Sequence, residues 1–244
     1  MLESDRPRTA RAMTQVMATR ELSPHMRRIT LGGPEVAAFL QVDGVDAPAA
    51  WVKVFLPTGE SRAYTISGID HQAGTLDLDF VLHGTDAACG PASAWASQAN
   101  VGEHVGIAGP RSGGFVLPVD ARWLMLAGDA TALPAIQSIA RQLPTGLKVK
   151  VYLEVAGEAD QHPIESLAQL RVAWLVGQET AGIALRQSLM YRPLPSGPGY
   201  VWIAGESGAV RALRTHYLYE RGLARHRVSA KGYWKAGEAN HRDS

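Results

Sequence analysis

The sequence predicts two dissimilar halves: an antiparallel β-barrel in residues 1–119 and an α/β domain with a parallel sheet in residues 120–244. In the first half, short β-like segments end at Gly and Pro turns. In the second half, short apolar runs alternate with segments of helix length. The change falls near Leu117–Arg122. With 46% hydrophobic and 19% charged residues, the chain predicts a packed core.

The first half contains about six short segments that suit a closed barrel. Thr75–Leu82 gives the clearest pattern, because Leu76, Leu78, Phe80 and Leu82 alternate with polar residues. Glu35–Gln41 is expected to form a brief helix. The expected strands are Ala12–Thr19, Met26–Leu31, Trp51–Leu56, Arg62–Ser67, Thr75–Leu82 and His104–Ala108.

The second half alternates strands with helices, which predicts a parallel sheet that is covered on both faces. The expected strands are Trp123–Leu126, Leu147–Val155, Arg171–Val176, Tyr200–Ala204 and Val228–Trp234. The expected helices are Leu133–Arg141, Ile183–Met190 and Ala209–Arg221.

Composition excludes several classes of function. The net charge of +1 gives no electrostatic basis for nucleic-acid binding. Cys89 is the single cysteine, so an internal disulfide or an iron–sulfur cluster is impossible, and the eight histidines are too scattered to predict a metal site. No apolar run suits a signal peptide or a membrane span, which predicts a cytoplasmic protein without membrane contact.

The stretch Arg62–Ser67 is the central candidate for a binding site. On a strand, Arg62, Tyr64 and Ile66 share one face, while Ala63, Thr65 and Ser67 share the other. An aromatic ring beside a guanidinium suits a ligand with a flat ring and phosphates. For this stretch alone, an ordinary barrel strand with a solvated Arg is the competing interpretation.

Three further segments place backbone amides at helix starts. Gly90-Pro91-Ala92-Ser93 begins a short helix whose positive end suits a pyrophosphate, although a plain capped helix fits equally well. Asp129 and Thr131 follow an apolar strand, as helix caps or as part of a ligand-binding loop. Gly205-Glu206-Ser207-Gly208 repeats this arrangement at the same sheet edge. There is no Gly-x-Gly-x-x-Gly motif.

The tail Lys231-Gly232-Tyr233-Trp234-Lys235 is either a solvated terminal strand or a lid whose cations face an anionic ligand. Together with the strand and helix starts above, it forms an ordered series of five motifs. From about Val16 to Gly237, this series resembles the siderophore-interacting, FAD-binding proteins. These are the ferric-siderophore reductases of the ferredoxin-reductase-like superfamily.

The resemblance implies a flavin-binding barrel and an NAD(P)H-binding-like domain. It implies that electrons pass from NAD(P)H, or from another donor such as a ferredoxin, through FAD to Fe(III) in a siderophore. The flavin would carry the chemistry, so no general acid, nucleophile or metal site is expected. The implied cofactor-binding residues are Arg62, Tyr64, Thr65, Ser67, His83, Gly90, Pro91, Ala92, Ser93, Asp129, Thr131 and Trp234. The implied siderophore-binding residues are Lys53, Lys231 and Lys235.

Two positions depart from the family pattern. Ser67 stands where a second Arg is frequent and Ala130 where Glu is common, which implies the loss of one pyrophosphate contact and weaker FAD retention. The acidic residues Glu154, Glu158 and Asp160 after one strand favour NADH over NADPH, because a carboxylate there can bond a ribose hydroxyl. An exposed acidic loop explains the same residues.

Two other functions remain open. One is a general NAD(P)H:flavin or ferredoxin-type reductase, for which iron release is incidental. The other is a siderophore-binding protein without catalysis. The flavin-site residues argue against a simple binding protein, which has no use for Tyr64 or for the helix start at Gly90.

Overall fold

The computed structural model describes residues 9–82, 90–177 and 180–238. Six antiparallel strands form a closed barrel in the order β1-β2-β5-β4-β3-β6. This part of the predicted fold is confirmed. The strands are β1 (Ala10–Ser23), β2 (Met26–Gly32), β3 (Trp51–Phe55), β4 (Ser61–Asp70), β5 (Thr75–Val81) and β6 (His104–Arg111).

The barrel core follows the alternation of the strands. Leu76, Leu78 and Phe80 of β5 are each at most 1% exposed, as the sequence pattern predicts. Two short helices accompany the barrel: α1 (Pro34–Phe39) packs beside β1, and α2 (Pro91–Gln98) lies near β2 and β5.

Strand β6 is longer than expected, so the predicted end at Ala108 is wrong. Arg111 still pairs with Trp51 of β3. A register shift between Trp51 and Lys53 takes up the extra residues around the cis bond Gly109–Pro110, so a proline is accommodated without ending the strand.

The second half is a five-stranded parallel sheet in the order β11-β10-β7-β8-β9. Its strands are β7 (Trp123–Asp129), β8 (Lys148–Val155), β9 (Gln169–Val176), β10 (Gly199–Glu206) and β11 (Val228–Trp234). Helix α3 (Leu133–Arg141) covers one face, and α4 (Ile183–Met190) and α5 (Ser207–Thr215) lie side by side on the other. The predicted α/β fold is therefore confirmed.

Helix α5 is shorter than predicted. It ends at Thr215 and passes into a π-helical turn, His216–Glu220, instead of continuing to Arg221. Tyr217 in this turn is 1% exposed, and its hydroxyl donates to the Met125 sulfur of β7 at 3.1 Å. The turn thus packs an aromatic side chain under the sheet.

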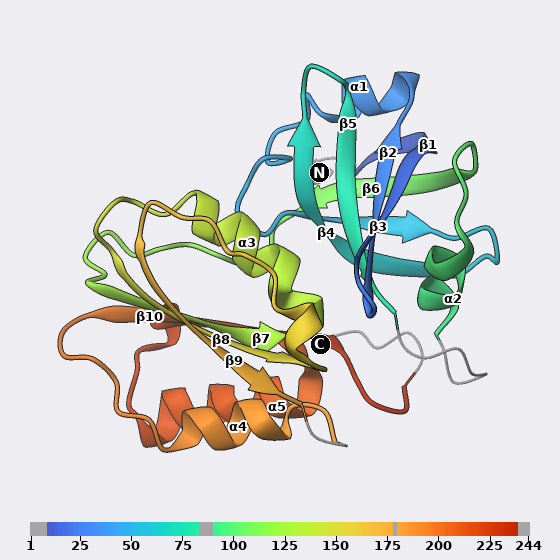
Figure 1. Cartoon of the computed structure of the whole chain (residues 1–244). Coiled ribbons are helices and arrows are strands. Elements are labelled where there is room, and N and C mark those ends of the chain that lie inside the picture. Colours follow the sequence, from blue (N-terminus) through green and yellow to red (C-terminus); the bar gives the residue numbers. More distant parts are fainter. Residues whose placement is uncertain (1–8, 83–89, 178–179, 239–244) are drawn as a thin grey trace, which may run out of the picture.

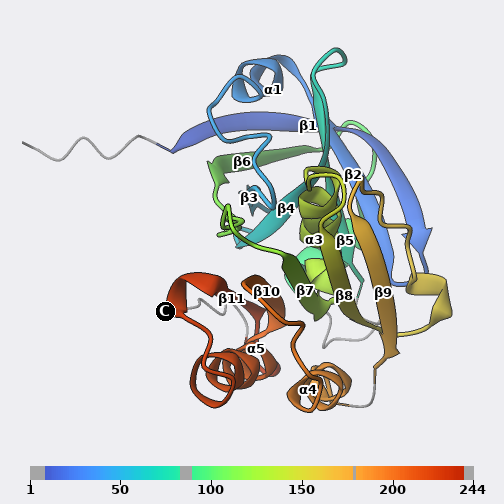
Figure 2. The ribbon, with the colours of Figure 1, turned by 90° about the vertical axis from the view of Figure 1, so that its left-hand side faces the viewer.

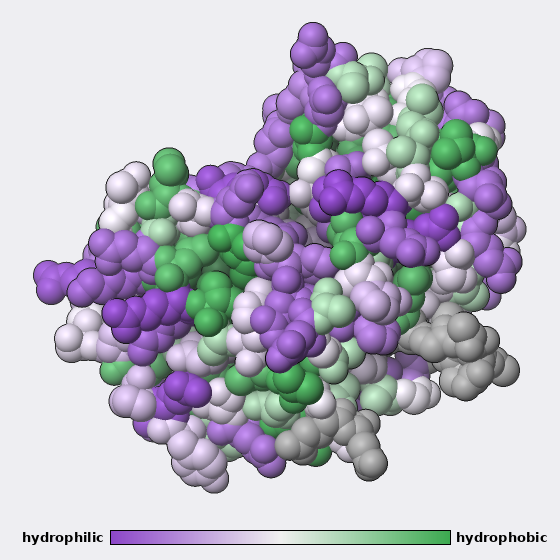
Figure 3. Space-filling model, viewed as in Figure 1, coloured by the Kyte–Doolittle hydropathy of each residue, from purple (hydrophilic) through white to green (hydrophobic). Residues whose placement is uncertain are grey.

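The barrel and the parallel sheet meet at α3. Figure 2 shows α3 between the sheet and strand β4. The Arg141 guanidinium donates to the Ser67 carbonyl oxygen at 2.6 Å, which ties α3 to β4. On the face shown in Figure 3, the surface is notched between two lobes, the barrel and the α/β domain. Across the described part of the chain, no helix is long and apolar enough to cross a bilayer.

Candidate flavin site between the barrel and the sheet

Strand β4 is covered on both sides. Tyr64 and Ile66 pack with the barrel core, as their shared face predicts. Thr65 and Ser67 point the other way and are also buried, at 7% and 3% exposure, because α3 and β11 lie over this side. The strand therefore has one side in the barrel and the other at the junction of the two lobes.

A row of aromatic rings connects β4 to α2. The Tyr64 and Phe80 ring centroids are 4.0 Å apart, and the Phe80 and Trp95 centroids are 5.4 Å apart with an edge-on geometry. Trp95 belongs to α2, and its indole nitrogen donates to Glu103 Oε2 at 3.1 Å. The predicted binding strand and the predicted binding helix thus form one continuous wall.

Helix α2 starts where the sequence predicts, with Pro91 in its first position. Its N-cap residue, Gly90, has no side chain, and its first turn contains no acidic residue. A Cβ added to Gly90 would meet no atom of the described residues within 4 Å. Among the described residues nothing covers this helix start, and its amide dipoles favour an anion.

The opposite end of α2 is held by Arg27, which the sequence analysis did not single out. Its guanidinium donates to the carbonyl oxygens of Ala96 at 3.0 Å, Ser97 at 2.5 Å and Ala99 at 3.2 Å. These carbonyls at the helix C-terminus have no partner in the helix itself. Arg27 thus fixes the direction in which the N-terminus of α2 points. His83, the predicted neighbour of this helix start, lies outside the described residues.

Asp129 is 8% exposed at the end of β7 and is surrounded by donors. Its Oδ1 accepts from the Thr131 amide at 2.9 Å and from the Thr131 hydroxyl at 2.5 Å. Its Oδ2 accepts from the Glu206 amide at 2.8 Å and from the Trp234 indole at 2.9 Å. The carboxylate joins the ends of β7, β10 and β11, so the cap interpretation is confirmed for Asp129, whereas the Thr131 hydroxyl donates to Asp129 and caps no helix.

Tyr233 of β11 connects this network to β4. Burial raises the pKa of the Tyr233 phenol, a hydrogen bond with the Thr65 side chain lowers it, and the nearby Asp129 carboxylate raises it again. The net pKa is raised, so the phenol stays protonated near neutral pH. The two motifs, Arg-x-Tyr-Thr and Lys-Gly-Tyr-Trp, therefore touch through Thr65 and Tyr233.

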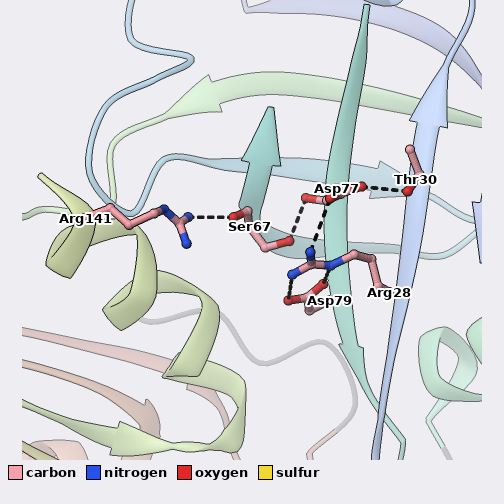
Figure 4. A network of polar contacts seen from close by, with 6 residues as sticks. All are labelled: Arg28, Thr30, Ser67, Asp77, Asp79 and Arg141. Atoms are coloured by element: carbon pink, nitrogen blue, oxygen red, sulfur yellow. Dashed lines mark hydrogen bonds and ion pairs between the residues drawn. The ribbon is translucent and has the colours of Figure 1, made fainter. Parts of the chain in front are cut away.

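Ser67 belongs to a polar network on the other part of β4 (Figure 4). Its hydroxyl donates to the Asp77 carbonyl oxygen at 3.0 Å, and Asp77 accepts from Thr30 at 2.6 Å. Arg28 binds Asp79 through two bonds, at 2.7 and 2.9 Å, and this hydrogen bonding raises the pKa of the guanidinium. The Ser67 hydroxyl thus bonds within the protein, beside α3.

The three predicted siderophore-binding lysines have different environments. Val52 and Val54 are fully buried, so Lys53 between them lies on the outer side of the barrel. The Lys231 amine donates to the Ser112 carbonyl oxygen at 2.8 Å. Lys235 pairs with Glu238 three residues later. The terminal strand is therefore partly buried and bonded, instead of forming a loose lid.

Three cationic side chains lie near Trp51, an arrangement that the sequence did not predict. Its indole donates to the same Ser112 carbonyl at 3.0 Å, and the Arg111 guanidinium lies 5.3 Å from its ring centroid. Lys53 is two residues away on the same side of β3. Arg111, Lys53 and Lys231 thus lie around the partly buried Trp51 ring, and pairing between β3 and β6 is the signal that would have found Arg111.

The acidic residues expected to choose the nucleotide are already bonded, apart from Glu158. Glu154 is 6% exposed and accepts from the amides of Gly182 and Leu185, both at 2.8 Å. Asp160 accepts from the Ser23 hydroxyl at 2.6 Å and pairs with His25 at 3.0 Å. Because these two carboxylates bond groups of the protein, they no longer support a preference for NADH over NADPH.

A separate hollow of about 500 Å³ lies on the outside of the barrel. It is formed by β1, β3 and β6, and its lining includes Met13, Phe55 and His104. It contains none of the predicted site residues.

Both halves of the chain match models of one family. Residues 121–237 match "Siderophore-interacting protein", and residues 15–61 and 58–114 match "Siderophore-interacting FAD-binding domain". The ferric vibriobactin reductase ViuB of Vibrio cholerae is 32% identical over 89% of this chain and 86% of its own length. The chain belongs to the siderophore-interacting FAD-binding protein family.

Solved structures show the same fold along nearly the whole chain. A siderophore utilization protein from T. fusca has a TM-score of 0.83 and 30% identity, covering 96% of both chains. The siderophore-interacting protein SipS from Aeromonas hydrophila has a TM-score of 0.79 and 30% identity, covering 95% of this chain and 94% of its own. A ferredoxin reductase of carbazole 1,9a-dioxygenase shares the fold, with a TM-score of 0.71 at 18% identity over 93% of this chain and 70% of its own.

The residues of this chain fit the FAD that the family binds. Arg62 lies near the start of β4, where its guanidinium donates to the Ser61 carbonyl oxygen at 2.9 Å. A guanidinium and the first amides of α2 can donate to a pyrophosphate, and the Tyr64 ring can lie against a flavin. Gly90 has no side chain, and none of the described residues blocks the approach of a ligand to its backbone.

Proposed function

We propose that this protein is an FAD-dependent ferric-siderophore reductase. The main support is its similarity to a ferric vibriobactin reductase over most of the length of both chains. The β4–α2 wall supports the same proposal from geometry, because its groups suit a flavin and its diphosphate. The division at residues 119 and 120 and a cytoplasmic location stay predictions.

The proposed roles follow from the chemistry of each group. Arg62 would bond the FAD phosphates, and the first turn of α2 would add amide dipoles that favour the same charge. Tyr64, whose ring centroid is 4.0 Å from that of Phe80, would line the flavin. The bond between Thr65 and Tyr233 brings β11 against the opposite side of β4, so the α/β domain would border the flavin site as well.

FAD supplies the electron chemistry when it is bound, linking a donor to single-electron reduction of the substrate iron. The substrate is Fe(III) in a siderophore, whose hard oxygen ligands hold the ferric ion more tightly than the ferrous ion. The protein's part is to bind and orient the reactants and to place a cationic surface next to the flavin. We place that surface at Lys53, Arg111 and Lys231 around Trp51, while Lys235 is weakened as a candidate by its pairing with Glu238.

FAD binding provides the direct test of the proposed site. We expect Arg62→Ala to weaken FAD binding by about 2 kcal/mol, or roughly thirtyfold in Kd, which is typical for a lost hydrogen bond to a charged group. Titration of the protein with FAD, followed by flavin fluorescence, measures this. Arg11→Ala is the matched control, because Arg11 lies over Phe55 on the outside of the barrel. Equal affinities of all three proteins would refute the site.

Two other functions give different results in the same system. A general flavin or ferredoxin-type reductase would reduce free FMN or a carrier protein faster than a ferric siderophore. A siderophore-binding protein without catalysis would bind the chelate tightly and stay colourless when FAD is added. Comparing acceptors at equal concentration separates these functions from the proposed one.

A further inference from the structure

The parallel sheet has a topological switch point between β7 and β10. From β7, the chain adds β8 and β9 on one side and β10 and β11 on the other. In open α/β sheets, ligands bind in the crevice at the carboxyl ends of the strands beside such a point. A dinucleotide places its diphosphate there, against the N-terminus of a helix. The helices that start at this edge are α3, α4 and α5.

Carboxylates of the protein itself bond amides in the first turns of α4 and α5, and another caps the 3₁₀ turn Ala130–Ala132 that leads into α3. Asp129 accepts from the Thr131 amide at 2.9 Å, in the turn that leads into α3. Glu206 accepts from the Ala209 amide at 2.8 Å in the first turn of α5. Each carboxylate takes the amide that a phosphate oxygen would use.

The N-terminus of helix α4 is capped by a carboxylate from a residue distant in sequence. Glu154, at the end of β8, bonds the Gly182 amide with one oxygen and the Leu185 amide with the other, both at 2.8 Å. The start of α4 also lies next to α5, since a Cβ on Gly182 would come within 2.5 Å of the Ala209 Cβ. The two capping carboxylates therefore border one small region.

Asp129 also fills the switch point itself. Its Oδ2 accepts from the Glu206 amide at 2.8 Å, which joins the ends of β7 and β10. Gly205 has a φ of 136°, and a Cβ there would lie 2.5 Å from this oxygen. The backbone thus closes around the carboxylate where a crevice would otherwise open. Helix α2 of the barrel differs, because its first turn contains no acidic residue.

We propose that these three carboxylates exclude the diphosphate of NADH and NADPH from the sheet edge, and that Glu206 is the main specificity-determining residue. Asp129 and Glu154 are 8% and 6% exposed, whereas Glu206 is more exposed and therefore more accessible to a dissolved anion. The proposal rests on the proposed function, because it concerns how electrons reach the flavin. It means that a nicotinamide dinucleotide gains little binding energy from its diphosphate in this protein.

Binding of the unreactive NAD⁺ to the FAD-loaded protein tests this without catalysis. By calorimetry, we expect the wild type to show no saturation up to about 1 mM NAD⁺. Glu206→Gln keeps an oxygen that can accept from Ala209 but removes the charge, and should tighten NAD⁺ binding at least fivefold. Glu165→Gln removes an exposed charge from the loop before β9 and should change nothing. Glu206→Ser also removes the charge but provides a different capping side chain, so it tests the same effect if Glu206→Gln misfolds.

The salt dependence of NAD⁺ binding provides a second test of the repulsion. Repulsion is screened by ions, so NAD⁺ binding to the wild type should strengthen between about 20 and 300 mM salt. Micromolar NAD⁺ binding by the wild type, or no gain in Glu206→Gln and Glu206→Ser, would overturn the proposal.

Reduction rates provide an independent comparison. The wild type should be reduced by NADH no more than about tenfold faster than by 1-benzyl-1,4-dihydronicotinamide, which has no diphosphate. The proposed function is judged separately, by iron release from a ferric siderophore after photoreduction of the FAD-loaded protein. Absence of iron release would refute the reductase and leave the NAD⁺ result unaffected.

Discussion

The Asp129 carboxylate should stabilise the fold even when no flavin is bound. In Asp129→Asn, one oxygen becomes an amide group, so the donors on one side of the carboxyl lose their acceptor. Those donors are either the two groups of Thr131 or the Glu206 amide and the Trp234 indole. Two lost bonds to a charged acceptor cost about 3 kcal/mol of unfolding free energy. In a chain of this size, that lowers the Tm by about 6 to 12 °C.

Thermal unfolding of the FAD-free protein measures this effect, and an FAD titration of the same variant completes the comparison. Asp43→Asn is the control, because Asp43 is exposed and lies outside the network. We expect its Tm to equal that of the wild type. If Asp129→Asn left the Tm of the FAD-free protein unchanged and only weakened FAD binding, Asp129 would be a flavin contact and not a structural clamp.

Three further predictions concern the supports of the site. Arg27→Ala should weaken FAD binding several-fold although Arg27 is at the far end of α2, because that helix loses three carbonyl bonds; an unchanged Kd would show that α2 is held otherwise. Burial raises the Asp160 pKa, but bonds from Ser23 and His25 outweigh it and the net pKa is lowered. The ionised Asp160 carboxylate therefore stabilises the fold above the usual pKa of about 3.9, and this contribution is lost as the pH falls through the pKa of the folded state. In Asp160→Asn, the unfolding free energy measured with urea should fall less steeply as the pH is lowered. Replacing Lys53, Lys231 and Lys235 together by Ala should weaken ferric-siderophore binding at least tenfold relative to the control Lys148→Ala. An affinity equal to that of the control would show that these lysines do not belong to the site.

Local patterns predicted the elements of the fold well. Helices α3 and α4 have the predicted ends, Leu133–Arg141 and Ile183–Met190, because each has apolar residues at helical spacing between clear breaks. The two faces of β4 were predicted from alternation alone, and the start of α2 from Gly90 and Pro91.

What the sequence did not reveal depends on contacts between distant residues. Glu154 caps α4 across 28 residues, and no local pattern distinguishes this from a carboxylate that awaits a ribose. Arg27 reaches the end of α2 some 70 residues later, and Arg111 meets Trp51 only through strand pairing. The end of β6 was misjudged because a register shift allows Pro110 inside a strand.

The proposed activity is tested most directly by counting the iron released per flavin. The FAD-loaded protein is photoreduced without oxygen and mixed with a ferric siderophore and a chelator that traps Fe(II). The proposed function predicts that the flavin colour returns as roughly two Fe(II) appear per FAD, since each iron takes one electron. A protein that takes up no FAD, or reduced flavin that stays colourless while the ferric siderophore remains intact, would contradict it.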